Sequence, residues 1–161
     1  MVIISDTSCI SALLRVGQLN LLESIFEEII IPQKVMDELF QLKNFGIDIS
    51  PLQNADWVII KNPNNNALLN RLLIQLDEGE ANAITLAIEL NADLLIIDEI
   101  KGRKIASSLS INITGLAGVL ILAKKEGYLK SVKPTLDKIL NETSFRMSKI
   151  LYQQILDAAS E

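Results

Sequence analysis

The sequence predicts an α/β fold in which a central parallel sheet is covered by helices on both faces. Its short strand-like segments are uniformly apolar, which is typical of strands buried on both faces. Segments with apolar residues three or four positions apart, typical of amphipathic helices, separate these strands. Such alternation indicates a layered α/β/α domain. With 161 residues, the chain is long enough for one domain with a substantial core, and we expect residues 1–161 to form it.

The first part of the chain is expected to form three strands and their connecting helices. In chain order these are a strand at residues 2–4, helices at 11–16 and 19–26, a strand at 29–31, a helix at 32–42 and a strand at 57–60. Thr7 or Ser8 is expected to cap the first helix. Pro32 stops the second strand and suits the first turn of the helix that follows. Residues 44–56 are rich in turn formers and are expected to form a loop.

The second part of the chain contains the most hydrophobic strand. The expected elements are helices at residues 67–76 and 78–90, a strand at 94–98, a helix at 102–109, a strand at 111–114, and helices at 115–126, 132–141 and 148–159. Gly127 is expected to close the helix before it.

The composition excludes several kinds of site. The chain has no histidine, so histidine bases, Ser-His-Asp triads and histidine metal ligands are absent. Its single cysteine excludes an internal disulfide and a cysteine-rich zinc site. A metal bound by carboxylate oxygens alone would be Mg²⁺ or Mn²⁺. The net charge of −5 argues against a basic nucleic-acid-binding face, but it is compatible with a nuclease whose acidic site is neutralised by metal.

We expect a cytoplasmic protein that does not enter a membrane. No apolar run approaches the roughly 18 to 20 residues that a membrane span needs. The N-terminal residues lack the basic region and cleavage site of a signal peptide.

Two aspartates stand where predicted strands end. Asp6 follows the first strand, and Asp98, with Glu99 beside it, ends the most hydrophobic one. In parallel sheets, functional groups collect beyond the carboxyl ends of the strands. The alternatives are a helix cap or solvated carboxylate for Asp6 and an ordinary strand-to-helix turn for Asp98.

Two glutamates on predicted helices are further candidates. Glu80 has capping-box spacing from Asp77, but it also heads the buried stripe of its helix. Glu38 shares a helix side with apolar residues and can lean into a cleft, or it can be a partly solvated residue paired with Lys34 one turn earlier. Four carboxylates in one cleft would need a counter-charge, and a divalent metal supplies it while activating water for attack on a phosphate.

Several segments together resemble a known family. They are residues 6–8, 31–38, 76–84, 92–99 with Gly102 and Arg103, and 113–120 with Ala123 and Lys124. In this order and spacing, over residues 1 to about 157, the chain resembles PIN domains, specifically the short prokaryotic subgroup called DUF3368.

The resemblance implies a fold, a reaction and partners. It implies a sheet order of 3-2-1-4-5 and assigns Asp6, Glu38, Glu80 and Asp98 as the metal-binding and catalytic acids. The implied reaction is endonucleolytic hydrolysis of single-stranded or structured RNA with Mg²⁺ or Mn²⁺. Many members are toxins of toxin–antitoxin pairs, silenced by an antitoxin protein that enters the cleft, and homodimers are common.

The chain also departs from the common PIN pattern. Ile96 stands where many PIN domains have Thr or Ser, and the third acid is Glu80 rather than Asp. A non-catalytic protein-interaction module that keeps the fold is therefore the alternative, whereas a phosphoacceptor domain lacks its acidic pair and lysine. Around the four acids, the supporting residues are expected to be Thr7, Ser8, Glu99, Arg103 and Thr114.

Overall fold

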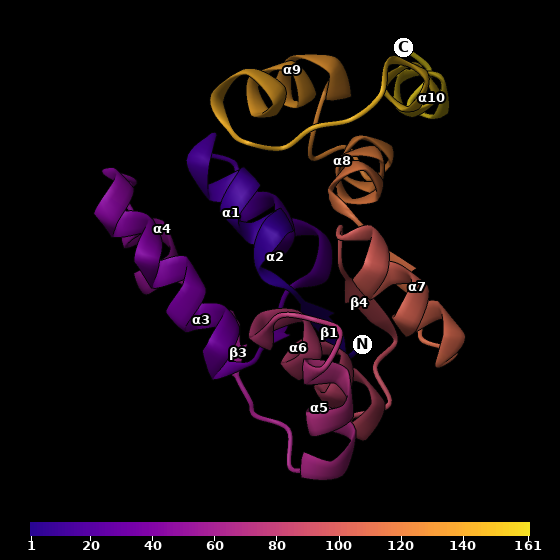
Figure 1. Cartoon of the computed structure of the whole chain (residues 1–161). Helices are drawn as coiled ribbons and strands as arrows, with labels where there is room; N and C mark the ends of the chain where they lie inside the picture. Colours follow the sequence, from indigo (N-terminus) through magenta and orange to yellow (C-terminus); the bar gives the residue numbers. More distant parts are fainter.

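A five-stranded parallel sheet forms the centre of the computed structural model, which describes residues 1–161 (Figure 1). The strands are β1 (Ile3–Ser5), β2 (Ile29–Ile31), β3 (Val58–Ile60), β4 (Leu94–Ile96) and β5 (Ile113–Thr114). Their order is β3-β2-β1-β4-β5, and all neighbouring pairs are parallel. The predicted α/β class and the sheet order implied by the PIN resemblance are both confirmed.

Helices cover both faces of this sheet. They are α1 (Thr7–Arg15), α2 (Asn20–Phe26), α3 (Gln33–Phe40), α4 (Ser50–Gln53), α5 (Asn66–Leu73), α6 (Glu78–Glu89), α7 (Ile100–Ser108), α8 (Leu116–Lys125), α9 (Val132–Glu142) and α10 (Lys149–Ala158), with a 3₁₀ helix, η1, at Gln41–Phe45. The last three helices gather at one end of the molecule (Figure 1). No helix combines the length and the apolar character that crossing a membrane requires.

The strands divide the apolar residues between two cores because successive side chains point to opposite faces. Ile3, Ile29 and Ile31 belong to the larger core, which includes residues of α1, α2, α3, α8, α9 and α10. Ile4 and Ile30 belong to the smaller core with residues of α5, α6 and α7. Each of these isoleucines is at most 6% exposed, and such burial contributes about 1.5–3 kcal/mol per side chain. Because both faces of the sheet are buried, polar and apolar residues do not alternate along the strands.

The start of the first helix differs from the prediction. Helix α1 begins at Thr7, so neither Thr7 nor Ser8 is its cap, and Asp6 holds the N-cap position without a side-chain capping bond. Cys9, Ile10 and Leu13 are fully buried on one side of this helix. Packing of that apolar face, rather than capping chemistry, therefore determines where the helix starts.

Two connecting segments also differ from the prediction. The stretch predicted as a loop at 44–56 contains the end of η1 and all of α4. Pro51 suits the first turn of α4, and Leu52, 2% exposed, anchors it in the core. Helix α5 ends at Leu73, earlier than predicted, and the chain then turns so that Asp77 can start α6.

One edge of the sheet collects the ends of several elements. The Asp6 N–H donates to the Ile96 carbonyl oxygen at 2.9 Å, so the ends of β1 and β4 are adjacent. Helix α3 packs against both α1 and α6. Side chains from the start of α6 and the middle of α3 can therefore reach the edge where Asp6 stands.

Candidate functional site

The four predicted acids come from four separate elements and lie near one another at this edge. Asp6 follows β1, Glu38 is on α3, Glu80 is on α6 and Asp98 follows β4. Asp6 is 4% exposed and Glu80 6%, while Glu38 and Asp98 are partly buried. Negative charges on Glu38 and Asp98 contribute to the raised pKa of Asp6, and Asp6 contributes to that of Glu80. The structure thus brings Asp6 within electrostatic reach of each of the other three acids.

Asp6 is the most buried of these acids. Burial, followed by the negative charges of neighbouring acids with Asp77 first, raises its pKa from 3.8 to about 7. The Thr7 backbone N–H offsets part of this effect. No side-chain hydrogen bond caps the helix through Asp6. Asp6 thus occupies the N-cap position, as the helix-cap alternative expected, but without a capping bond from its side chain.

Glu38 is held in place by two donors from other elements. The Thr7 hydroxyl donates to Oε2, and the Gly79 N–H donates to Oε1 at 3.2 Å. Burial nevertheless raises the pKa of Glu38, and these hydrogen bonds only partly oppose it. Lys34 pairs with Glu78 instead, at 3.4 Å between Nζ and Oε2. The alternative in which Glu38 is simply paired with Lys34 is therefore wrong.

Glu80 forms only half of the predicted capping box. Asp77 Oδ1 accepts from the Glu80 N–H at 2.8 Å, so Asp77 is the N-cap of α6. The Glu80 side chain is buried, and burial followed by the charge of Asp77 raises its pKa to about 8. Asp77 also raises the pKa of Asp6 and Glu38. It is thus a fifth acid of the site, which we did not predict because its capping role already explained its presence.

Asp98 carries an unpartnered oxygen. Its Oδ1 accepts from the Leu116 N–H at 2.9 Å, whereas its Oδ2 is buried and has no hydrogen-bond partner. Burial raises the pKa of Asp98, and the Leu116 N–H and Arg103 oppose the increase. Arg103 Nη1 itself donates to the Ile97 carbonyl oxygen at 2.8 Å and forms no ion pair. Arg103 therefore affects Asp98 through its charge rather than as a direct tether.

Two glycines allow acids to approach the backbone of another element. A Cβ atom at Gly79 would lie 2.7 Å from both Glu38 carboxylate oxygens, and one at Gly115 would lie 2.5 Å from Asp98 Oδ1. Both distances are too short for a real contact. The absence of a side chain at these positions is therefore a condition for the observed placement of Glu38 and Asp98.

The remaining supporting residues have different surroundings. Ser8 lines the cleft described below, and Glu99 is exposed at the N-cap position of α7 without a capping bond. Thr114 lies in β5, and its carbonyl oxygen accepts from the Ile97 N–H at 2.8 Å. That bond continues the pairing of β4 and β5 up to the residue before Asp98.

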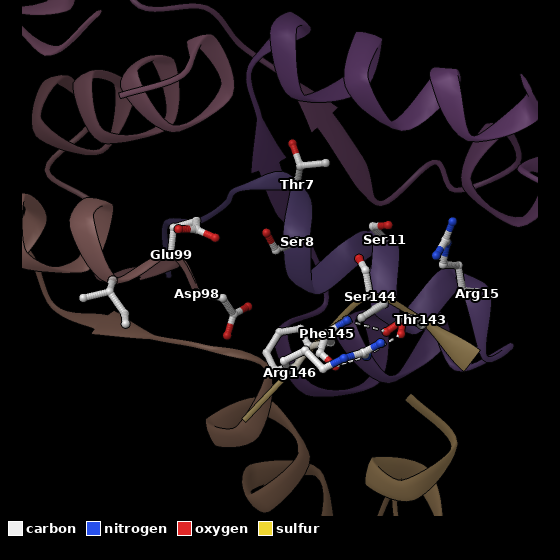
Figure 2. A pocket seen from close by; sticks show the side chains of 12 residues that line it. Thr7, Ser8, Ser11, Arg15, Asp98, Glu99, Thr143, Ser144, Phe145 and Arg146 are labelled. Carbon is white, nitrogen blue, oxygen red and sulfur yellow. Dashed lines mark hydrogen bonds between the residues drawn. The ribbon is translucent and has the colours of Figure 1, made fainter. Parts of the chain in front are cut away.

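A cleft of about 470 Å³ opens beside Asp98, which is the only one of the four candidate acids that lines it (Figure 2). Twelve residues from α1, the start of α7 and the connection between α9 and α10 line it: Thr7, Ser8, Ser11, Ala12, Arg15, Asp98, Glu99, Ile100, Thr143, Ser144, Phe145 and Arg146. We did not predict Ser11, Arg15 or Arg146 as site residues. The spacing of Thr7, Ser11 and Arg15 on one helix face was an available signal, but nothing local links Arg146 to them.

The side chains at this edge fit a hard divalent cation. The ionisable donors are carboxylates, and the buried Asp98 Oδ2 has no donor in the protein. Carboxylates that crowd together without counter-charge favour a cation among them. No three acidic side chains already surround a common point closely enough to hold an ion. Binding therefore requires side-chain rotations, for example of Glu38 away from Thr7.

Comparisons with known proteins identify a family for this chain. The family model described as "PIN domain", DUF3368, matches residues 2–161. The chain belongs to the PIN-domain family. A solved structure of a PilT N-terminus domain protein from the hyperthermophilic archaeon Sulfolobus solfataricus P2 is similar, with 21% identity and a TM-score of 0.47. The alignment covers 91% of this chain and 100% of that one. No curated protein matches the chain.

Membership gives this PIN domain a general chemical context. PIN domains are generally nucleases, and they usually use divalent metals. The resemblance inferred from the sequence motifs is thereby confirmed.

Proposed function

We propose that this PIN-domain protein is an endoribonuclease that hydrolyses RNA phosphodiester bonds with Mg²⁺ or Mn²⁺ held by Asp6, Glu38, Glu80 and Asp98. The observation that supports the proposal is that Asp6, at the carboxyl edge of the sheet, lies within electrostatic reach of three acids from other elements: Glu38, Glu80 and Asp98. Each has a raised pKa, and burial is the first cause in every case. Perturbed carboxylates clustered beside a cleft are typical of functional sites.

The chain's own groups prepare the site for a cation and a phosphate. Asp98 presents one oxygen to the site while the Leu116 N–H holds the other. Thr7 and Gly79 orient Glu38. With a pKa of about 8, Glu80 keeps a proton at neutral pH, so it must release that proton when it becomes a ligand. A bound divalent ion supplies Lewis acidity toward the phosphate and a nucleophilic water.

The direct test is cleavage of RNA. Purified full-length protein is incubated with a labelled single-stranded RNA and Mn²⁺ or Mg²⁺, and products are resolved on a gel. Asp6→Asn removes a charge from the centre of the cluster, while Asp56→Asn removes one from an exposed residue elsewhere. Cleavage by wild type and Asp56→Asn, but not by Asp6→Asn or after chelation, supports the proposal. Equal cleavage by Asp6→Asn rejects this site assignment.

A non-catalytic interaction module is the second candidate. It is favoured by the hydrogen bonds that already occupy Glu38 and by the absence of three converging ligand groups. Calorimetric titration distinguishes the two candidates. A divalent site with affinity in or below the millimolar range, abolished by Asp98→Asn, fits the nuclease, whereas no binding of Mg²⁺ or Mn²⁺ fits the module.

We further propose that the protein is the toxin of a toxin–antitoxin pair and forms a homodimer. Family membership supports the toxin role, and the open cleft beside the acids offers an antitoxin protein a place to enter. Induced expression in a bacterial host should arrest growth for the wild type but not for Asp6→Asn. Sedimentation should give twice the monomer mass, and a monomer would reject the dimer.

A further inference from the structure

The cleft beside the acids has two ends of opposite charge. Asp98 and Glu99 stand at one end and Arg15 at the other, and Arg146 lies between them on the connection between α9 and α10 (Figure 2). Residues with hydroxyl side chains also line the cleft, namely Ser8, Ser11, Thr143 and Ser144. Because hydroxyls donate hydrogen bonds and arginines carry fixed positive charge, this wall suits an anionic ligand that also reaches the acidic end.

Neither arginine is neutralised by a carboxylate. The three ion pairs of the chain all use lysines, so all four arginines lack an acidic partner. The Nε atom of Arg15 is buried without a hydrogen-bond partner. Arg146 donates through Nη1 to the carbonyl oxygens of Thr143 at 2.9 Å and Phe145 at 2.8 Å, which orient its guanidinium within the loop. Two positive groups are thus available in a protein whose net charge is −5.

Helix α1 connects the two ends of the cleft. Thr7, Ser11 and Arg15 are four residues apart and therefore lie along one helix face. Eight residues of helix span about 12 Å at 1.5 Å per residue. This is about the rise of three to four stacked nucleotides at 3.4 Å each. A nucleic-acid strand at the acids therefore extends as far as Arg15.

We propose that Arg15 and Arg146 form a subsite for backbone phosphates of a single-stranded RNA, next to the phosphate placed at the acidic cluster. This inference rests on the proposed nuclease function and identifies where the flanking nucleotides bind. Arginine suits this role because its planar guanidinium offers paired donors to phosphate oxygens. Ser11, one helical turn before Arg15 on α1, adds a neutral hydroxyl donor.

The charge layout favours a phosphodiester chain over an acidic peptide. An RNA strand can share a divalent cation with the acidic end while its next phosphates neutralise the arginines. An acidic peptide could satisfy only the arginines, because Asp98 and Glu99 would repel its carboxylates. The cleft is lined along one side by α1 and along another by the α9–α10 connection.

Binding, measured separately from cleavage, tests the subsite. Fluorescence anisotropy follows a labelled single-stranded oligoribonucleotide with hydrolysis-resistant phosphorothioate linkages on the full chain in Mg²⁺. Arg15→Gln and Arg146→Gln should each raise Kd about five- to tenfold and lower the salt dependence of log K by about one charge. Arg71→Gln, an exposed arginine on α5 outside the cleft, is the matched control and should change neither.

Each outcome decides for or against the subsite. Unchanged Kd and salt slope in both variants, or no binding by wild type, overturns it. So does displacement of the RNA by a glutamate peptide at equal concentration. Should Arg15→Gln fail to fold, the exposed Arg146→Gln still tests the charge, and Arg15→Lys, which keeps the charge, tests the paired guanidinium donors. Arginine-dependent binding without cleavage by wild type retains the subsite and rejects the nuclease. Cleavage that needs Asp6 but neither arginine retains the nuclease and rejects the subsite.

Discussion

Two carboxylates of this protein, Asp6 and Glu161, occupy opposite environments. The Glu161 side chain accepts hydrogen bonds from the Ser131 hydroxyl, the Val132 N–H at 2.6 Å, the Lys133 N–H at 3.2 Å and Lys124 Nζ at 3.2 Å. These donors, the Ser131 hydroxyl first, lower its pKa to about 2. Asp6 is buried among other acids, and its pKa is raised to about 7.

The difference separates a carboxylate that stabilises the fold from one that destabilises it. Glu161 sits at the N-terminus of α9, where free backbone N–H groups favour negative charge. Asp6 is desolvated and has no comparable set of donors, so its charged form costs free energy. Such desolvated acids are typical of functional sites, and the use proposed for Asp6 is cation binding. Changes at the two places should therefore have opposite consequences.

The largest expected effect is the loss of RNA cleavage in Asp98→Asn. The substitution keeps an oxygen to accept from the Leu116 N–H but removes the negative charge from the site. We expect cleavage to fall about 1000-fold, the upper range for loss of one electrostatic contact in an active site. The melting temperature should stay the same or rise, because a desolvated charge has been removed. A variant that cleaves normally, or that unfolds in the absence of metal, would contradict this separation.

Next in size is the pH dependence of stability in the absence of metal. The pKa of Asp6 in the folded protein, about 7, lies above its ordinary value of 3.8, so the folded state binds more protons between these values. Stability should therefore fall as pH rises from about 4 to 7, by on the order of 3 kcal/mol from Asp6. Denaturant titrations at several pH values measure this slope.

Asp6→Asn and added Mg²⁺ serve as controls for the pH slope. Both should make it shallower, the first by removing one titrating group and the second by compensating negative charge. The other acids with raised pKa values, Glu38, Glu80 and Asp98, still contribute to the slope in Asp6→Asn. A wild-type protein that is more stable at pH 8 than at pH 5 without metal would contradict the raised pKa of Asp6.

A smaller effect is expected from adding a methyl group beside Asp98. In Gly115→Ala, the new Cβ would lie 2.5 Å from Asp98 Oδ1 and 3.0 Å from Arg103 Nη1, so Asp98 must move. We expect metal affinity and cleavage to fall about tenfold, as when a ligand loses its positioning partner. Gly127→Ala is the control, since Gly127 has a φ of +85° and nothing within 4 Å. It should lower stability but leave metal affinity intact, and an equal loss of affinity in both variants would rule out a local cause.

The smallest effect is expected at the start of α9. Glu161→Gln weakens the hydrogen bonds to Ser131 and the helix N-terminus, so the melting temperature at pH 7 should drop by about 2 °C. The lowered pKa of Glu161 means that its contribution is present above about pH 4.5 and disappears as pH falls toward 2. Wild type and variant should then melt alike near pH 2. Loss of RNA cleavage in this variant would contradict the proposed division between the two regions.

Much of the fold and part of the candidate site could be predicted from the sequence. The strands were recognisable because burial on both faces demands uninterrupted apolar residues, as at Ile29–Ile31. Asp6 and Asp98 were recognisable because each directly follows such a strand. Helix starts were less predictable, since the packing of Ile10 and Leu13 extended α1 past the expected cap.

The glutamates could be proposed but not placed. Spacing alone allowed Glu80 to be either a capping residue or a site acid, and only the packing of α3 against α6 shows it buried near Asp6. Lys34 was a plausible partner for Glu38 in the sequence, but in the structure the Glu38 carboxylate accepts hydrogen bonds from Thr7 and Gly79 instead. Asp77 was predicted to be the N-cap of its helix, and this prediction is confirmed. Its effect on the pKa of the neighbouring acids depends on distances in space, which the sequence does not give.

By itself, the sequence determined the α/β class, the absence of histidine chemistry, and the presence of acids at strand ends, because each follows from local composition and periodicity. Only the tertiary structure decided which acids share one edge, which oxygen of Asp98 lacks a partner, and that Arg15 and Arg146 face the same cleft. The physical reason is that desolvation and charge–charge interaction depend on distances between elements far apart in the chain, and no local pattern encodes those distances.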